Sequence, residues 1–200
     1  MQLLFGIDEA GRGPLAGPVY AASCILPADF PIELLNDSKA LSEKKRAKIE
    51  PIIKEKALAY GIGFATHTEI DEINILQATL LAMKRAFENM LVMLKDKSLF
   101  DLEKAEIAGV VDGKFIPNIQ FPCKAEPKAD GKYPCVMAAS ILAKNERDRV
   151  MVEYAKIYPE YDYEKHKGYP TPAHKEKCRQ IGPSPIQRHS FKYWFRFLLC

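Results

Sequence analysis

The chain of 200 residues is 48% hydrophobic and 28% charged, with both signs of charge interspersed. These values are typical of one globular domain with a sizeable core, and they exclude a disordered chain. The formal net charge of +3 is too small to identify a class of partner by itself.

The charge is distributed unevenly along the chain. Residues 144–200 hold 12 Lys and Arg against 7 Asp and Glu, whereas residues 1–143 have a balance of −2. A basic C-terminal quarter beside an acidic remainder fits a protein that holds a polyanion with one part and metal cations with another. On charge alone, an ordinary solvated surface is the simpler interpretation.

The five cysteines and the apolar segments limit where the protein works. No two cysteines have the spacing of a zinc knuckle or a redox motif, and their number is odd, so we expect free thiols in a reducing cytosol. The first seven residues are typical of a short strand that ends at Asp8 and Glu9, rather than of a signal peptide. No apolar run approaches the length of a membrane span.

The first part of the chain alternates strands and helices. We expect strands at 3–7, 18–26 and 58–65, the first of which ends in charge and then glycine. Proline and polar residues mark a loop at 27–38, and Ser42 is a candidate N-cap for a helix at 43–56. Pro51 is expected to kink or break that helix.

The second part continues the alternation. Thr68 and Asp71 are interpreted as the two ends of a capping box. The helix that follows has an apolar stripe at helical spacing: Leu76, Leu80, Met83, Phe87, Met90 and Leu94. A fourth strand is expected at 107–111, ending at Asp112.

Pro134 suits the first turn of a long helix at 134–157. We expect its buried stripe to include Val136, Ser140, Ala143, Val150, Tyr154 and Ile157. Short helices and proline-rich turns follow Pro159. Strands interleaved with helices predict a layered α/β domain with a helical C-terminal tail.

Acidic residues at strand ends are the candidate metal ligands. Asp8 and Glu9 follow the first strand, Asp112 follows the fourth, and Asp130 precedes the long helix. Mg²⁺ prefers carboxylate oxygens, and a pair of such ions can activate water in phosphodiester hydrolysis. Adjacent strand residues point to opposite faces, so Asp8 and Glu9 can share a metal centre only where the strand breaks or twists; Gly11 and Gly13 favour such a break.

An acid at the end of a strand need not bind a metal. A single Asp there is often a turn or N-cap residue, and for Asp130 alone this is the simpler interpretation. Glu69, Asp71 and Glu72 form a denser acidic cluster, but a helix start accounts for them, so they are left out of the site.

Gly11, Arg12 and Gly13 form a second candidate element. As a dinucleotide-binding motif they match poorly, because the third glycine is missing and Pro14 intrudes. A backbone with little side chain can instead approach a sugar closely and test for a 2′-hydroxyl group.

A basic loop at 165–169 contains Tyr169, and an aromatic ring among cations is a common nucleic-acid combination. Taken alone, a surface loop whose tyrosine packs inward is the simpler interpretation. The four histidines are scattered, and none pairs with a nucleophile in a recognisable way.

Together these residues resemble the bacterial ribonuclease HII family, the type 2 ribonucleases H. The resemblance begins with Gly6-Ile7-Asp8-Glu9-Ala10-Gly11-Arg12-Gly13-Pro14-Leu15-Ala16-Gly17-Pro18-Val19 and continues in family order. The later blocks lie at 35–39, 70–75, 111–113, 138–144, 166–169 and 182–185. They cover nearly the whole chain, and the opening block is the most specific.

The resemblance implies an RNase H-like fold with a central mixed β-sheet flanked by helices. It implies a catalytic domain at 1–158 and a helical, substrate-binding C-terminal extension at 159–200 that packs on it. It implies an endonuclease that hydrolyses the RNA strand of RNA–DNA duplexes and cuts 5′ of single ribonucleotides in DNA, leaving 5′-phosphates. It also implies Mg²⁺ or Mn²⁺ as cofactor and a cytoplasmic enzyme without membrane association, which we expect to be a monomer.

The resemblance also implies the roles of individual residues. Asp8, Glu9, Asp112 and Asp130 would be the catalytic and metal-binding carboxylates. The substrate-binding residues would be Gly11, Arg12 and Gly13 at the 2′-hydroxyl group, Tyr169 on the following deoxyribose, and Lys39.

Three positions depart from the family pattern: Ala129 replaces a glycine before Asp130, Tyr133 stands among usually small residues, and Pro170 follows Tyr169 in place of glycine. The related ribonuclease HIII has an added N-terminal domain and lacks the arginine of the Gly-Arg-Gly motif. Arg12 and the start at the catalytic strand therefore favour ribonuclease HII.

The last residues mix aromatic and basic side chains, and we expect a packed helix with its basic residues exposed. Gln187 with Tyr193 and Trp194 weakly resembles a sliding-clamp box, although Ser190 occupies the aliphatic position. Two alternatives to the enzyme remain open at this point. One is a non-catalytic nucleic-acid-binding protein, and the other is a two-metal nuclease such as a junction resolvase, which would cut all-DNA substrates.

Overall fold

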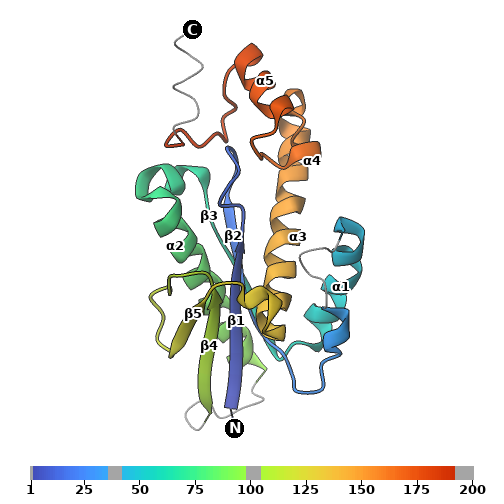
Figure 1. Ribbon diagram of the computed structural model, residues 1–200, viewed down its shortest axis with the longest axis vertical. Coiled ribbons are helices and arrows are strands. Elements are labelled where there is room, and N and C mark those ends of the chain that lie inside the picture. The colour runs from blue at the N-terminus through green and yellow to red at the C-terminus, as the bar shows by residue number, and fades with distance from the viewer. Residues whose placement is uncertain (1, 36–41, 98–104, 192–200) are drawn as a thin grey trace.

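The computed structural model describes residues 2–35, 42–97 and 105–191 and is built around one five-stranded sheet (Figure 1). The strand order is β3-β2-β1-β4-β5. Its strands are β1 Gln2–Ala10, β2 Val19–Ile25, β3 Ala59–Ala65, β4 Glu106–Asp112 and β5 Cys123–Glu126. The pairs β1–β2 and β2–β3 are antiparallel, whereas β1–β4 and β4–β5 are parallel. The predicted mixed sheet is therefore confirmed, with β5 as a strand that the sequence patterns did not indicate.

Helix α2, His67–Asp96, covers one face of the sheet (Figure 1). Its apolar side packs with alternate residues of β1, among them Phe5 and Ile7, into the largest core cluster. The predicted capping box was misplaced: the N-cap is Thr66, whose side chain accepts from the amide of Glu69 while Glu69 bonds back to the Thr66 amide. Thr68 lies inside the first turn, where its hydroxyl contacts that of Thr66 at 2.8 Å.

Asn74 interrupts the regular geometry of α2. Its backbone has φ 67° and ψ 164°, so two helical segments meet at a kink there. The Asn74 side chain accepts hydrogen bonds from the amides of Leu76 and Gln77 and so caps the second segment. The predicted stripe then enters the core fully from Met83 to Leu94, whereas Leu76 and Leu80 are half-buried.

Helices α1, Glu43–Lys56, and α3, Pro134–Ile157, lie on the opposite face (Figure 1). The close approach of α3 requires glycine at position 6, because a Cβ atom there would lie 2.3 Å from the Val136 amide nitrogen. Ser42 caps α1 as predicted. Of the two outcomes predicted for Pro51, a break does not occur, because α1 continues through it to Lys56. One missing N–H group is tolerated where tertiary packing supports the helix.

The far half of α3 differs from the predicted stripe. Ile157 is 63% exposed, whereas Arg147 and Asp148 are buried.

After α3 come η3 Pro159–Tyr161, α4 Tyr163–His166 and α5 Pro172–Ile181. A separate apolar cluster joins this segment to α3 and to the loop after β1 through Ala16, Met151, Tyr163, Cys178 and Ile186. The boundary between a catalytic domain and an extension at residue 159 stays a prediction, and the predicted tail helix falls mostly outside the described residues.

The predictions about membrane spans and cysteines can be compared with the described residues. Across residues 2–35, 42–97 and 105–191, no helix combines the length and the apolar character needed to cross a membrane. The cysteines within these ranges, Cys24, Cys123, Cys135 and Cys178, are all free thiols, as expected.

Candidate active site

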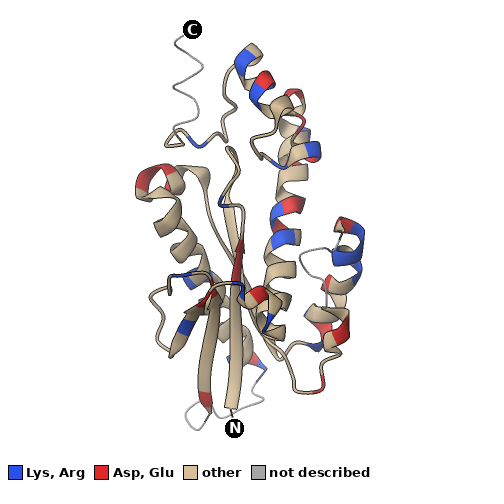
Figure 2. Cartoon of the chain, in the orientation of Figure 1, with Lys and Arg blue, Asp and Glu red and all other residues tan. Residues whose placement is uncertain are grey.

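Asp8 and Asp112 come together because two parallel strands end at the same level. The last paired residues of β1 and β4 are Ile7 and Val111, which both point to the α2 face. The next residue on each strand therefore points to the α3 face. Figure 2 shows acidic residues on β1 and near the ends of β4 and β5, between the helices that cover the two faces.

Glu9 leaves β1 on the opposite side from Asp8. Of the two possibilities considered for this strand, a break does not occur at the acids, because β1 keeps its antiparallel pairing with β2 through Ala10. The backbone changes direction only after both acids, at Gly11, which has φ +102°. Glu9 instead lies 3.5 Å from the guanidinium group of Arg12, which is half exposed.

The electrostatics show that the acids lie close together. Burial raises the pKa of Asp8 well above its ordinary value, and the negative charges of Glu9 and Asp112 raise it further. Burial likewise raises the pKa of Glu9, with Arg12 opposing and Asp112 reinforcing the shift. A buried carboxylate whose pKa is raised by neighbouring negative charges gains from a bound cation.

Asp130 is delivered to the same edge by a single turn. It lies in η2, Ala129–Gly131, and its side chain is buried. The amide of Ala129 donates to Oδ1 of Asp112 at 2.7 Å, so Asp130 follows directly after a residue bonded to the β4 acid. Lys128 takes the left-handed conformation before this turn, with φ 63°. The Tyr133 hydroxyl donates to Glu126 at 2.8 Å.

The four carboxylates offer an all-oxygen donor set, which suits a hard divalent cation such as Mg²⁺ or Mn²⁺. Within the described part of the chain, however, no three His, Cys, Asp or Glu side chains already lie in a geometry that would hold a metal ion. One Asp8 oxygen accepts from the Glu9 amide, and one Asp112 oxygen accepts from Ala129. The chemistry of the site therefore fits a cation, provided that side chains rotate to converge on it.

Ser140 is a site residue that the sequence patterns assigned only to a buried helical stripe. It projects from α3 toward β1, and its hydrogen bond to Asp8 lowers the pKa of that carboxyl group, against the larger effect of burial. The signal available in the sequence was a polar residue among the alanines of 138–143. Such a residue on a buried helix face needs a hydrogen-bond partner.

The glycine loop and Tyr169 lie side by side, although 156 positions separate Gly13 from Tyr169 in the chain. A Cβ atom built on Gly13 would lie 3.8 Å from Cε1 of Tyr169. The tyrosine is 38% exposed, so the inward-packed alternative does not hold. Lys144 and Arg147 place their cationic groups 5.7 and 5.6 Å from the centre of its ring.

Two histidines hold the turn that carries Tyr169. The amide of Gly168 donates to Nδ1 of His166, and Nδ1 of His174 contacts the carbonyl oxygen of Tyr169 at 2.9 Å. Their rings stack with centroids 4.4 Å apart. Burial lowers the pKa of His174 to about 4 and also lowers that of His166, which favours the neutral form of both rings. The histidines of this segment are therefore structural, which agrees with the absence of a recognisable nucleophile pair.

The remaining candidates fall outside this site. Lys39 lies outside the described residues. Glu69 pairs with Arg85 at 2.7 Å and caps α2, as the helix-start interpretation predicted. Asp71 instead accepts hydrogen bonds from the amides of His189 and Ser190, and so ties the C-terminal segment to α2.

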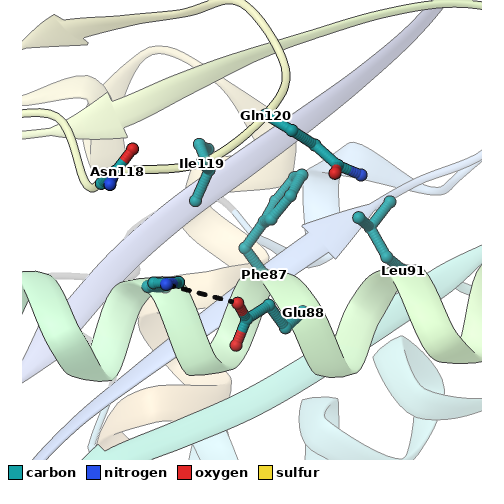
Figure 3. A pocket seen from close by; sticks show the side chains of 7 residues that line it. Phe87, Glu88, Leu91, Asn118, Ile119 and Gln120 are labelled. Atoms are coloured by element: carbon teal, nitrogen blue, oxygen red, sulfur yellow. Dashed lines mark ion pairs between the residues drawn. The ribbon is translucent and has the colours of Figure 1, made fainter.

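A hollow between α2 and the loop before β5 contains none of the predicted site residues. It is lined by Lys84, Phe87, Glu88, Leu91, Asn118, Ile119 and Gln120 and encloses about 340 Å³ (Figure 3). Phe87 points into the space between Ile119 and Leu91, and Lys84 pairs with Glu88 at 3.8 Å. Because these side chains also border the main core, we interpret the hollow as a packing feature.

Comparison with known proteins agrees with the resemblance. The family model for ribonuclease HII matches residues 5–194. Ribonuclease HII of Treponema denticola is 54% identical, with 94% of this chain and 98% of that protein covered. Ribonuclease HII of Dechloromonas aromatica is 51% identical, with 94% and 90% covered.

Solved structures share the fold. Ribonuclease H2 from Pyrococcus horikoshii has a TM-score of 0.72 at 27% identity, with 98% of this chain and 96% of that chain covered. Bst-RNase HIII in complex with Mn²⁺ has a TM-score of 0.73 at 18% identity, with 98% and 69% covered. The RNase H-like fold is thereby confirmed.

The non-catalytic alternative and the resolvase alternative find no support in these comparisons. The acids at the strand ends, the fold and the match along nearly the whole sequence agree with one another. The chain belongs to the ribonuclease HII family of type 2 ribonucleases H, divalent-metal-dependent endonucleases that act on RNA paired with DNA.

Proposed function

We propose that this endonuclease also incises DNA duplexes on the 5′ side of a single embedded ribonucleotide, leaving 3′-hydroxyl and 5′-phosphate ends. One observation carries the proposal: the glycine loop that leaves the acidic strand end lies against the exposed ring of Tyr169. A junction between ribose and deoxyribose presents two neighbouring sugars that differ by one hydroxyl group. The glycine loop and the Tyr169 ring are adjacent and differ in chemistry, so together they suit the recognition of two such sugars.

The catalytic part of the proposal assigns Asp8, Glu9, Asp112 and Asp130 as ligands of two Mg²⁺ or Mn²⁺ ions. Bound there, the ions would supply an activated water and stabilise the leaving oxygen. The protein's own contribution is to hold four carboxylates at one sheet edge despite their repulsion. The raised pKa values of Asp8 and Glu9 support this role, because they indicate negative charge crowded into a buried site.

The reading part assigns the backbone of Gly11, Arg12 and Gly13 to the 2′-hydroxyl group of the ribonucleotide. Tyr169 would stack on the following deoxyribose, where a second hydroxyl group would crowd the ring. Lys144, whose ammonium group lies 5.7 Å from the centre of that ring, supplies positive charge for the neighbouring phosphates. Lys39 is proposed as a further phosphate contact from the family resemblance alone.

A single-turnover cleavage assay tests the proposal. Three end-labelled duplexes of one sequence carry no ribonucleotide, one ribonucleotide or a uniform RNA strand, and each is incubated with Mg²⁺ or Mn²⁺. We expect cutting of the second and third duplexes, with the product ends mapped to the 5′ side of the lone ribonucleotide. Cleavage of the uniform hybrid alone would contradict junction reading, and cleavage of the all-DNA duplex would favour the resolvase alternative.

The same assay addresses the metal. Titration of each ion, with cleavage rate and calorimetric heat measured in parallel, distinguishes Mg²⁺ from Mn²⁺. Two binding events with one dependent on the duplex would support the two-ion mechanism. A single ion sufficient for full rate would contradict it.

We propose that any sliding-clamp contact uses residues that follow Gln187. A PCNA:RNase HII complex from Archaeoglobus fulgidus has a TM-score of 0.74 to this chain at 24% identity. Gln187 itself is fully buried, and its side-chain amide donates to the carbonyl oxygen of Leu15 at 2.8 Å. Calorimetry of the full chain with its own clamp, compared with a chain ending at residue 191, tests the contact.

The monomeric state and cytoplasmic location remain predictions.

A further inference from the structure

Two buried arginines lie behind the glycine loop. Arg147 comes from α3 and Arg188 from the segment after α5, and neither side chain is exposed to solvent. Among the residues that the structure describes, neither forms an ion pair with a carboxylate within 4 Å. Burying a charge without a counterion costs free energy, which hydrogen bonds to the charged group must offset. The hydrogen-bond partners of the two arginines therefore indicate their role.

Arg188 directs its whole guanidinium group at one stretch of backbone. Its donors reach the carbonyl oxygens of five residues between 11 and 18: Gly11 at 2.7 Å, Pro14 and Gly17 at 2.8 Å, Pro18 at 3.1 Å and Arg12 at 3.2 Å. The planar fork of a guanidinium group presents its donors in one fixed arrangement. The backbone of the glycine loop is therefore curved so that its carbonyl oxygens face the guanidinium group of Arg188, a residue near the other end of the sequence.

Arg147 links this loop to the turn that carries Tyr169. Its guanidinium group donates to the carbonyl oxygen of Ala16 in the loop and to that of Lys167 in the turn, the latter at 3.0 Å. A Cβ atom on Gly11 would lie 2.1 Å from Nε of Arg147, so the loop rests directly on this side chain. A backbone bond from the Leu15 amide to the Gly168 carbonyl oxygen completes the connection.

We propose that Arg188 and Arg147 are positioning residues that set the gap between the Gly11–Gly13 backbone and the ring of Tyr169, and thereby the preference for a single ribonucleotide over a uniform hybrid. The inference rests on the proposed junction-reading function. Neither arginine is proposed to contact the substrate. Each acts through the backbone carbonyl groups that accept its hydrogen bonds.

The variants Arg188→Lys and Arg147→Lys keep the positive charge and remove the planar guanidinium group with its fixed set of donors. An ammonium group cannot reach five carbonyl oxygens spread along this stretch of backbone, so the loop loses its fixed shape. Arg149→Lys is the matched control, because Arg149 lies two positions along α3, is half exposed and bonds to Glu50 and Glu146. Cleavage of single-ribonucleotide and uniform-hybrid duplexes is measured under single-turnover conditions, and the amide resonances of Gly11 and Gly13 are recorded without substrate.

We expect both variants to lower the rate ratio of single-ribonucleotide to uniform-hybrid cleavage about tenfold and to shift the Gly11 and Gly13 resonances. Arg149→Lys should change neither. Unchanged glycine resonances would overturn the inference whatever the substrate preference, as would equal rate losses on both substrates. Failure of both variants to fold would also overturn it, in favour of a general structural role. A wild-type enzyme without junction preference would instead contradict the proposed function, while the resonances still test the positioning.

Discussion

The acidic strand ends and the proposed sugar-reading surface, which consists of Gly11–Gly13 and Tyr169, are built in different ways. The acids depend on regular secondary structure: parallel pairing of β1 with β4 places Asp8 beside Asp112 on one face of the sheet. The reading surface depends on irregular backbone, held by side chains from distant parts of the chain. Ala16 pairs with Gln187, and Arg188 bonds to carbonyl groups about 170 positions earlier.

This difference teaches which parts of the enzyme tolerate change. A strand end keeps its position as long as the sheet forms, since the ladder of backbone bonds does not depend on one side chain. The glycine loop has no such ladder, and its shape depends on a few buried groups whose removal leaves carbonyl oxygens without donors. We therefore expect substitutions at the acids to affect chemistry, and substitutions behind the loop to affect which substrate is preferred.

The largest expected effect is that of Asp8→Asn. The substitution removes a proposed ligand charge with almost no change of volume, so cleavage should fall by about 10³-fold or more while duplex binding persists. Single-turnover rates and fluorescence anisotropy measure the two quantities. Glu72→Gln, an exposed acid on α2, serves as the control and should cleave at the wild-type rate. Near-normal turnover of Asp8→Asn would remove the assignment of the metal centre.

Asp112→Asn and Asp130→Asn test whether the two acids act together. The bond from Ala129 to Asp112 brings η2 to the end of β4, so equally deep losses are expected from both. Glu126→Gln is the control from the neighbouring strand: this acid on β5 is the register partner of Asp112, but its carboxylate is held by Lys124, Lys132 and Tyr133. A mild effect of Asp130→Asn beside a severe one of Asp112→Asn would mean that the Ala129 and Tyr133 context has displaced the fourth carboxylate.

Tyr169→Ala should have a smaller and selective effect. Stacking on a sugar or base is worth roughly 1–3 kcal/mol, so cutting at a lone ribonucleotide should fall by about tenfold to a hundredfold. Uniform hybrids should lose less, because the deoxyribose that the ring prefers is absent. Tyr169→Phe is the control and should be nearly silent. Equal slowing of both substrates would show that the ring does not read the junction.

The smallest expected effect concerns the pH dependence of stability. The folded state holds His174 with a pKa of about 4, against 6.5 for the free side chain, so the unfolded chain binds the extra proton first. Stability is therefore complete above pH 6.5 and falls as the pH drops toward 4, by on the order of 2 kcal/mol between about pH 7 and pH 5.

Urea unfolding of wild type and His174→Gln at both pH values isolates this contribution from that of other groups. We expect the variant to be less stable at neutral pH but to lose less on acidification. An identical loss in both proteins would show that His174 does not carry the pH dependence.

Much of the scaffold could be predicted because its signals are local. Helix 134–157 has the predicted bounds, since Pro134 favours a first turn and no further proline occurs before Pro159. The capping box was displaced by two residues because Thr66 and Thr68 both precede acids at compatible spacing. The short strand β5 was missed, because only its parallel pairing with β4 distinguishes it from a loop.

The sequence by itself indicated the family, the order of four strands and the three long helices, and the acids proposed as catalytic, because strand ends and glycine motifs leave local patterns. Only the tertiary structure decided that Glu9 leaves β1 opposite Asp8, that Ser140 bonds to Asp8, and that Arg188 shapes the glycine loop. These relations join residues far apart in the chain or depend on strand register. Hydrogen bonds across such separations leave no periodicity in the sequence, so they become visible only when the chain has folded.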